Sequence, residues 1–281
     1  MSRIATRQFY PMTAAESTRY RTRALRKWGG SDRARGVGAR GYAPVMDLVF
    51  GTRESDSPLV RSVWTCTSEQ VSEMTSVASE TVGLVFWEQH GRRFAAVTGP
   101  ESRTATAPVP EGARFVGIQF AVGASLRMAP TTALVDSGIV LPDVCGRRFF
   151  LDGAYREMPG PDDAEALVER LADEGVVVLD PLVAQAARGT TPAVSPRTLE
   201  RRFRAATGHT RGAVRRIERA RAAAVLLSAG ETTAEVIDKL GYYDEPHLAR
   251  ALRRYVGRTA GQLRTGTGGA LALDTAQRTT S

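Results

Sequence analysis

The sequence is poor in the residues that build metal centres, disulfide frameworks and membrane anchors. Its two cysteines, Cys66 and Cys145, lie far apart and form no Cys-x-x-Cys pair, so neither a disulfide framework nor a zinc site is expected. We interpret both as small buried hydrophobes, with redox sensing as the alternative. No apolar run approaches membrane-spanning length, and no apolar segment follows the basic first residues as in a secretory signal. These absences favour a cytoplasmic protein without a membrane partner.

Residues that support catalysis are also scarce. Of the three histidines, His209 and His247 lie in the last third of the chain, and His90 precedes Gly91 in an expected hairpin turn. A single remaining histidine cannot form the His-rich metal site of a metalloenzyme. The sequence has no Ser/His/Asp or Cys/His arrangement and no phosphate-binding loop. We therefore expect no catalytic residue, no metal, no cofactor and no enzyme activity.

Positive charge is abundant but unevenly distributed. Residues 1–40 carry ten Lys or Arg against two Asp or Glu, and residues 180–264 carry sixteen against eight. Residues 41–179 carry eleven against nineteen and are acidic. Charge asymmetry of this kind indicates a polyanion partner for the basic parts and not for the middle of the chain.

Residues 41–175 have the pattern of a β-rich domain. Short apolar runs alternate with turn dipeptides such as His90-Gly91 and Gly99-Pro100. Many short strands at such spacing favour a sandwich or a small barrel. Residues 162–174 predict an amphipathic helix that closes this domain, because their apolar positions fall on one stripe. The expected strands contain residues 45–50, 60–64, 82–87, 94–97, 115–120 and 139–141.

The two ends of the chain lack such periodicity. Residues 1–40 predict a basic, disordered extension, with an arm that touches DNA or phosphate as the alternative. The Gly-, Thr- and Ala-rich residues 265–281 predict a disordered tail. Within residues 176–264, a short apolar run at 176–179 precedes a helix over 180–188, residues 189–192 break that helix, and residues 195–263 are predicted to be helical with short connections. The expected fold is therefore α+β with two domains, a β-rich one followed by an all-α one.

One pattern occurs twice in the helical segment, at an offset of 49 positions. The first copy begins at Ser195 and closes with Gly208-His209-Thr210, and the second begins at Asp244 and closes with Gly257-Arg258-Thr259. Each starts with a helix-capping residue and continues with Leu, Arg, a large apolar residue and Arg at identical spacing. Two copies of a short basic amphipathic helix predict two docking elements for DNA.

Each copy predicts one buried and one basic helix face. A long helix over roughly 212–227 joins the copies and fixes their separation. A further helix over 232–240, followed by a turn at Gly241-Tyr242, gives the second copy helix-turn-helix geometry. The predicted buried residues are Leu199, Phe203 and Ala206 in the first copy and Leu248, Leu252 and Tyr255 in the second.

The basic faces predict the residues that bind DNA. A helix in the major groove contacts bases with residues of its first two turns and contacts phosphate with flanking residues. Arginine forms a bidentate pair of hydrogen bonds with guanine. We therefore expect Arg197, Arg201 and Arg250 to read bases. Glu200 either accepts a hydrogen bond from cytosine or pairs with Arg204 at i+4. The predicted DNA-binding residues are Arg197, Thr198, Glu200, Arg201 and Arg204 in the first helix and His247, Arg250 and Arg254 in the second.

Four motifs recur together across residues 180–264. They are Ser195-x3-Leu199-x-Arg201-x-Phe203 with Gly208, Arg219-x3-Ala223-x2-Leu226-Leu227, Gly241-Tyr242, and Leu248-x-Arg250-x-Leu252 with Gly257-Arg258-Thr259. With these motifs the segment resembles the DNA-binding domain of AraC/XylS-type bacterial transcription regulators. The resemblance implies two helix-turn-helix units joined by a linker helix, which bind adjacent major-groove segments on one face of double-stranded DNA.

The chain departs from that family in the first unit and in the second reading helix. Between Pro181 and Ser195 there is room for one short helix, where the family has two. In the second reading helix, Pro246 and Ala249 offer little hydrogen bonding. The first helix is therefore expected to carry more of the sequence reading.

Residues 115–124 resemble, more distantly, the cupin-like sensor domains attached to this family, which are jelly-roll barrels. The resemblance implies an unknown small-molecule effector, with RNA polymerase and a second copy of the chain as further candidate partners. No effector-binding residue is assigned by it. Five aromatic residues on the expected strands are candidates for lining an apolar effector pocket, although such residues more often belong to the core. They are Trp64, Phe86, Trp87, Phe115 and Phe120.

Three functions follow from these observations. The first is a sequence-specific transcription regulator in which a β-rich sensor domain controls a two-headed DNA-binding domain. The second is a weakly specific DNA-binding or chromosome-organising protein. The third is a metal-independent cupin-type binding protein or enzyme fused to a DNA anchor, which the shortage of histidine disfavours.

Overall fold

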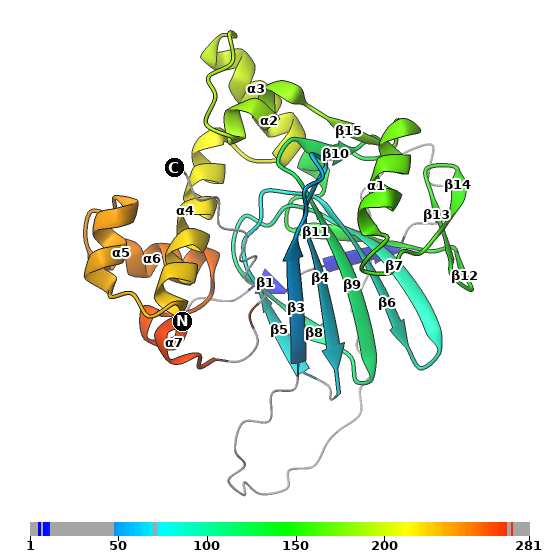
Figure 1. Ribbon diagram of the computed structural model, residues 1–281, viewed down its shortest axis with the longest axis horizontal. Helices are drawn as coiled ribbons and strands as arrows, with labels where there is room; N and C mark the ends of the chain where they lie inside the picture. Colours follow the sequence, from blue (N-terminus) through cyan, green and yellow to red (C-terminus); the bar gives the residue numbers. More distant parts are fainter. Residues whose placement is uncertain (1–4, 7, 12–47, 70–71, 269–270, 272–281) are drawn as a thin grey trace, which may run out of the picture.

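Figure 1 shows a computed structural model of the chain, which describes residues 5–6, 8–11, 48–69, 72–268 and 271. A β-rich region occupies one side of the molecule, and helices of the C-terminal part lie beside it and over one end of its sheet (Figure 1). The predicted order, a β-rich region followed by a helical one, is confirmed. None of the described helices is long and apolar enough to cross a membrane.

The β-rich region is built on one seven-stranded sheet in the order β2-β11-β7-β6-β9-β4-β3. Neighbouring strands are antiparallel except for β2 and β11, which are parallel. The strands of this sheet are β2 (Gln8–Pro11), β3 (Leu48–Glu54), β4 (Val60–Ser68), β6 (Gly83–Gln89), β7 (Arg92–Thr98), β9 (Ala113–Phe120) and β11 (Ser137–Leu141).

Two cores form on the two faces of this sheet because successive side chains of a strand point in opposite directions. On one face, Val63, Ile118 and Leu84 are buried in the main core, which helix α1 (Ala164–Asp173) completes. On the other face, Cys66 packs with Val109 of β8 (Ala105–Val109) in a smaller cluster. The structure is β-rich as predicted, whereas the cupin-like jelly roll stays a prediction.

Three smaller sheets complete the β-rich region. Strands β1, β8 and β5 form the first, β12, β13 and β14 the second, and β10 pairs with β15 in the third. In addition, a 3-10 turn, η1 (Thr131–Ala133), follows β10. The strands are β1 (Ala5–Thr6), β5 (Ser72–Ser76), β10 (Ala124–Leu126), β12 (Val144–Cys145), β13 (Arg148–Leu151), β14 (Ala154–Glu157) and β15 (Val177–Leu179).

The helical region follows the sequence prediction closely. Ser195 and Asp244 cap the two reading helices, and all six residues predicted to be buried on them are buried. One short helix precedes the first reading helix, as the spacing predicts. The helices are α2 (Pro181–Ala187), α3 (Pro196–Thr207), α4 (Arg211–Ser228), α5 (Thr233–Leu240), α6 (Glu245–Tyr255) and α7 (Ala260–Thr265).

Three expectations differ from the structure. Cys66 is buried, and burial raises the pKa of its thiol to about 11, but Cys145 is exposed because its strand lies in an outer hairpin beside the turn at Gly146. The prediction of a buried Cys145 is therefore wrong.

Within residues 1–40, Ala5–Thr6 and Gln8–Pro11 form strands in place of an unstructured extension. All other residues of that extension lie outside the described residues. Of the predicted disordered tail, residues 265–268 and 271 are described: Thr265 ends α7 and Leu271 pairs with Thr75 in an isolated bridge, so the prediction is wrong at these two residues.

Candidate DNA-binding surface

The first reading helix, α3, is fixed at its start by a hydrogen-bonded cap. The Ser195 hydroxyl accepts a hydrogen bond from the backbone N–H of Thr198 at 3.2 Å and lies 3.0 Å from the Thr198 hydroxyl. Thr198 is therefore part of the cap, and its side chain is less available to DNA than the sequence prediction assumes. Arg197 and Arg201 are exposed, opposite the buried face formed by Leu199 and Phe203. The structure thus presents two arginines on one solvent-facing surface of α3.

The structure favours the salt-bridge interpretation of Glu200. Its carboxylate lies 3.6 Å from Nε of Arg204 and accepts a hydrogen bond from the backbone N–H of Arg211 at 3.3 Å. These contacts tie α3 to the start of α4. Since the pair is largely solvent-exposed, it stabilises the protein by less than about 1 kcal/mol and can open to release Arg204.

Arg202 of the same helix holds α3 against α2 through an ion pair. Its guanidinium donates to Asp180 at 2.8 Å, and Asp180 also caps α2 by accepting from the backbone N–H of Leu182 and Val183. One carboxylate therefore holds α2 and orients α3 against it. This contact supports the single short helix that precedes the first reading helix.

The second reading helix, α6, is capped in the same manner. The Asp244 carboxylate accepts from the backbone N–H of His247 at 2.7 Å, while Nδ1 of His247 accepts from the backbone N–H of Tyr243 at 3.4 Å. The His247 ring also meets the edge of Tyr242, with ring centroids 5.2 Å apart. His247 is thus held by the turn, while Arg250 is exposed on the outer face.

Arg254 lies at the far end of α6. Its side chain is exposed and its guanidinium lies 5.4 Å from the ring centroid of Tyr255. The exposed Tyr243 before the helix was not among the predicted DNA-binding residues. Its position directly before a helix cap is the signal in the sequence that could have identified it.

The linker helix α4 joins the two units with a basic side of its own. Arg219 lies with its guanidinium 4.4 Å from the ring centroid of Tyr242 and donates to the carbonyl of Gly241 at 3.4 Å. Arg219 therefore fixes the turn of the second unit against the linker. Arg215 and Arg216 are exposed on the same helix and are available for phosphate.

These two capped helices, each presenting arginine to solvent and joined by one long helix, correspond to a known domain. Residues 191–266 match the family model of a helix-turn-helix domain. The match spans α3 to α7, includes both reading helices, and supports a DNA-binding transcription regulator of the AraC type. No curated protein and no solved structure matched the chain.

The β-rich region docks against both units of the helix-turn-helix domain. Val77 and Ala78 are buried in the same core as Leu252 of the second unit, and Val122 is buried in the same core as Phe203 of the first. Because both units bury side chains from the β-rich region, that region helps to set the relative position of α3 and α6.

Backbone hydrogen bonds reinforce this docking at the end of α6. The last carbonyl groups of a helix lack partners within the helix. Here the backbone N–H of Ala78 donates to the carbonyl of Tyr255 at 2.7 Å, and that of Thr104 donates to the carbonyl of Arg254 at 2.9 Å. The β-rich region therefore caps the second reading helix.

The glycines that close the two sequence copies lie at equivalent places in this interface. Gly208 and Gly257 both have positive φ, 69° and 76°. A Cβ on Gly208 would overlap Val135, and one on Gly257 would lie 2.6 Å from Oγ1 of Thr104. Both copies therefore require glycine for the turn and for the close approach of the β-rich region.

A buried ion pair joins the β-rich region to α4. Arg221 of α4 donates through Nη2 to both carboxylate oxygens of Glu80, and Nη1 of Arg61 donates to Oε1 of Glu80 at 2.6 Å. Glu80 is fully buried and Arg221 nearly so. Burial alone would raise the pKa of Glu80, but the charges of Arg221 and Arg61 outweigh burial and lower this pKa to about 2. Glu80 is therefore ionised at neutral pH.

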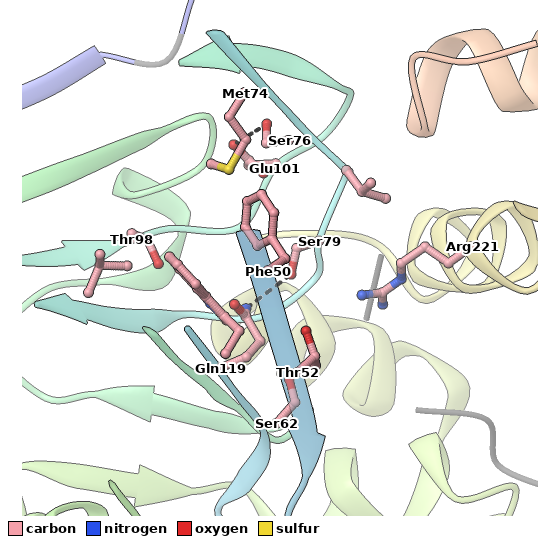
Figure 2. Close-up of a pocket in the computed structure, with 13 residues that line it drawn as sticks. Phe50, Thr52, Ser62, Met74, Ser76, Ser79, Thr98, Glu101, Gln119 and Arg221 are labelled. Atoms are coloured by element: carbon pink, nitrogen blue, oxygen red, sulfur yellow. Dashed lines mark hydrogen bonds between the residues drawn. The ribbon is translucent and has the colours of Figure 1, made fainter. Parts of the chain in front are cut away.

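A cavity of about 110 Å³ lies beside this ion pair, and Figure 2 shows the side chains that surround it. Sheet residues form one wall of the cavity. Ser76 and Ser79, which flank the interface residues Val77 and Ala78, line it from the β-rich region, and Arg221 lines it from the linker helix. The Ser76 hydroxyl donates to Glu101 at 3.0 Å and the Gln119 amide donates to Ser79 at 3.1 Å (Figure 2). The cavity thus adjoins the β-rich region and α4 together.

The aromatic residues considered for an effector pocket have different positions. Trp64 lines the cavity, together with Phe50 and Met74. Phe86 and Phe120 are buried in the main core, which confirms their interpretation as core residues. Trp87 and Phe115 stack on each other with ring centroids 6.2 Å apart and do not line the cavity.

Proposed function

We propose that this protein is a sequence-specific transcription regulator that reads adjacent major-groove segments with α3 and α6. The observation that carries the proposal is the repeated arrangement of a capped helix, a buried apolar stripe and exposed arginines, on both sides of α4. In this proposal Arg197, Arg201 and Arg250 contact base edges. Arg204 and Arg254, further along their helices, contact phosphate, and so do the backbone groups at the two capped helix starts.

Selection of bound sites from a random DNA library with the full chain tests this function. A preferred sequence with two half-sites about one helical turn apart is expected, because each reading helix enters its own major-groove segment. Strongly salt-dependent binding with no preferred sequence would instead favour a weakly specific DNA-binding protein. That outcome would overturn the assignment of base reading.

Replacing Arg201 by Ala is expected to weaken binding to the selected site by about 1–3 kcal/mol and to relax one base position, because a bidentate contact to guanine is lost. Fluorescence anisotropy on the selected site and on single-base variants measures both effects. Arg114→Ala is the matched control, since it removes an exposed arginine from β9, far from the reading helices. Equal losses in the two variants would remove Arg201 from the base-reading set.

A second part of the proposal is control by a small molecule bound in the cavity. Its support is that the cavity is lined from both regions, by Ser79 beside the interface residue Ala78 and by Arg221 of the linker helix. A ligand there would contact the residues that hold the DNA-binding units. The cavity is smaller than engineered cavities of about 150 Å³ that bind benzene, so the ligand proposed for it has at most one ring.

A thermal-shift screen of single-ring compounds, such as phenol, benzoate and nicotinate, tests this cavity. A binding compound is expected to raise the Tm of the wild type, because it binds the folded state alone. The variant Thr52→Trp, which fills the cavity from an exposed position on β3, is expected to abolish the shift. An unchanged shift in Thr52→Trp would place the compound elsewhere.

A further inference from the structure

The residue that precedes each helix cap differs between the two units. Val194 precedes the cap of α3, and Tyr243, 49 positions later, precedes the cap of α6. Val194 is half-buried and packs against the cluster that contains Leu199. A residue at this position commonly packs against the fourth residue of the helix and so fixes the entry of the chain. The first unit follows this arrangement.

The second unit departs from it. Tyr243 is 90% exposed, twice as much as the next most exposed large hydrophobic side chain of the described residues, Tyr155 at 45%. The neighbouring Tyr242 is buried in the core of the second unit. Tyr243 therefore contributes its whole ring and hydroxyl to the surface instead of to packing.

The turn holds the backbone of Tyr243 in place. Its N–H donates to Nδ1 of His247, and the following residue, Asp244, caps α6. The ring of the preceding residue, Tyr242, packs against the guanidinium of Arg219. The exposure of Tyr243 is thus a property of an ordered turn between two anchored residues.

The position of Tyr243 extends the exposed side of α6. Within the helix, His247, Arg250 and Arg254 are spaced by three and four residues, whereas the buried stripe begins at Leu248. Side chains at three- and four-residue spacing lie on one side of a helix. Tyr243 precedes this helix, and the hydrogen bond from its N–H to Nδ1 of His247 places its backbone beside the start of the face that presents Arg250 to DNA in the proposed function.

We propose that Tyr243 is a DNA-backbone contact of the second unit, with its hydroxyl donating to a phosphate and its ring covering the adjacent sugar. The inference rests on the proposed function. Tyrosine is among the side chains that donate to phosphate oxygens, and such contacts fix register without reading sequence. Val194 has no hydrogen-bond donor in its side chain, so the contact is specific to the second unit.

The test compares Tyr243→Phe and Tyr243→Ala in the full chain with the matched control Tyr155→Phe. We expect Tyr243→Phe to weaken binding about tenfold, because a hydrogen bond to a charged group is lost. Tyr243→Ala should weaken it further, because the ring that covers the sugar is lost as well. The loss should be equal on the selected site and on random DNA, with the Tm and the salt dependence of binding unchanged, because no cation is removed. Tyr155→Phe should bind as the wild type does.

Three outcomes would overturn parts of this inference. Wild-type affinity in both Tyr243 variants, together with weakened binding in Arg201→Ala, would refute the contact and leave the proposed function standing. A loss confined to the selected site would refute the phosphate assignment, since it would mean that Tyr243 reads a base. If the wild type selected no site and Arg201→Ala had no effect, the proposed function would fall and the inference with it.

Discussion

Replacing Glu80 by Gln is expected to lower the free energy of unfolding by about 3–5 kcal/mol, because it leaves the charge of a buried Arg221 without its partner. Urea denaturation followed by circular dichroism measures this loss. The same variant is expected to bind the selected DNA site more weakly, since Glu80 joins the β-rich region to α4, the helix between the two reading helices.

Acid denaturation gives a second measurement of the same pair. The pKa of Glu80 in the folded protein, about 2, lies below the value of an unfolded glutamate, about 4.3. The unfolded state therefore binds more protons between these values, so the contribution of Glu80 is complete above about pH 5 and is lost as the pH falls toward 2. The Glu80→Gln variant should lack this part of the pH dependence.

Two comparison variants isolate the effect of burial. Glu88→Gln removes an exposed carboxylate that lies 2.9 Å from Arg93, and its expected cost is below about 1 kcal/mol. The double variant Glu80→Leu with Arg221→Leu removes the two most deeply buried charges and retains only the partly exposed Arg61, so it should be more stable than Glu80→Gln. If Glu80→Gln unfolded within about 1 kcal/mol of the wild type, the ion pair would have no structural role.

The helix boundaries of the C-terminal region could be predicted from the sequence because their signals are local. Ser195 and Asp244 cap their helices as predicted, and the linker helix, predicted over roughly 212–227, runs from Arg211 to Ser228. Capping residues and apolar spacing act within one or two turns, so a single sequence reveals them.

The docking of the two regions could not be predicted, because its contacts join distant residues. Glu80 and Arg221 are 141 positions apart, and no local pattern marks either of them as buried. The same limit applied to the predicted DNA-binding residues. Glu200 and His247 have helical spacing suited to DNA, but their partners, Arg211 and the backbone of Tyr243, depend on turns whose geometry the sequence does not show.

Replacing Gly257 by Ala is expected to cost about 2–5 kcal/mol of folding stability, through two separate effects. The residue has a φ of 76°, a left-handed conformation that costs an L-amino acid about 1–2 kcal/mol. The added Cβ would also lie 2.6 Å from Oγ1 of Thr104 and 3.0 Å from Cγ2 of Thr75, and overpacking of this kind costs about 1–3 kcal/mol. Thermal and urea unfolding measure the sum.

Gly266→Ala is the matched control, since its φ is 65° and nothing lies within 4 Å of an added Cβ. This variant should show the conformational cost alone, so the difference between the two variants measures the docking of the β-rich region. Gly257→Ala should also bind the selected DNA site more weakly, because the end of α6 would be pushed away from the backbone groups of Ala78 and Thr104 that cap it. Equal stability losses in the two variants would show that the turn at Gly257 relaxes without disturbing the interface. The two reading helices would then keep their separation without support from the β-rich region.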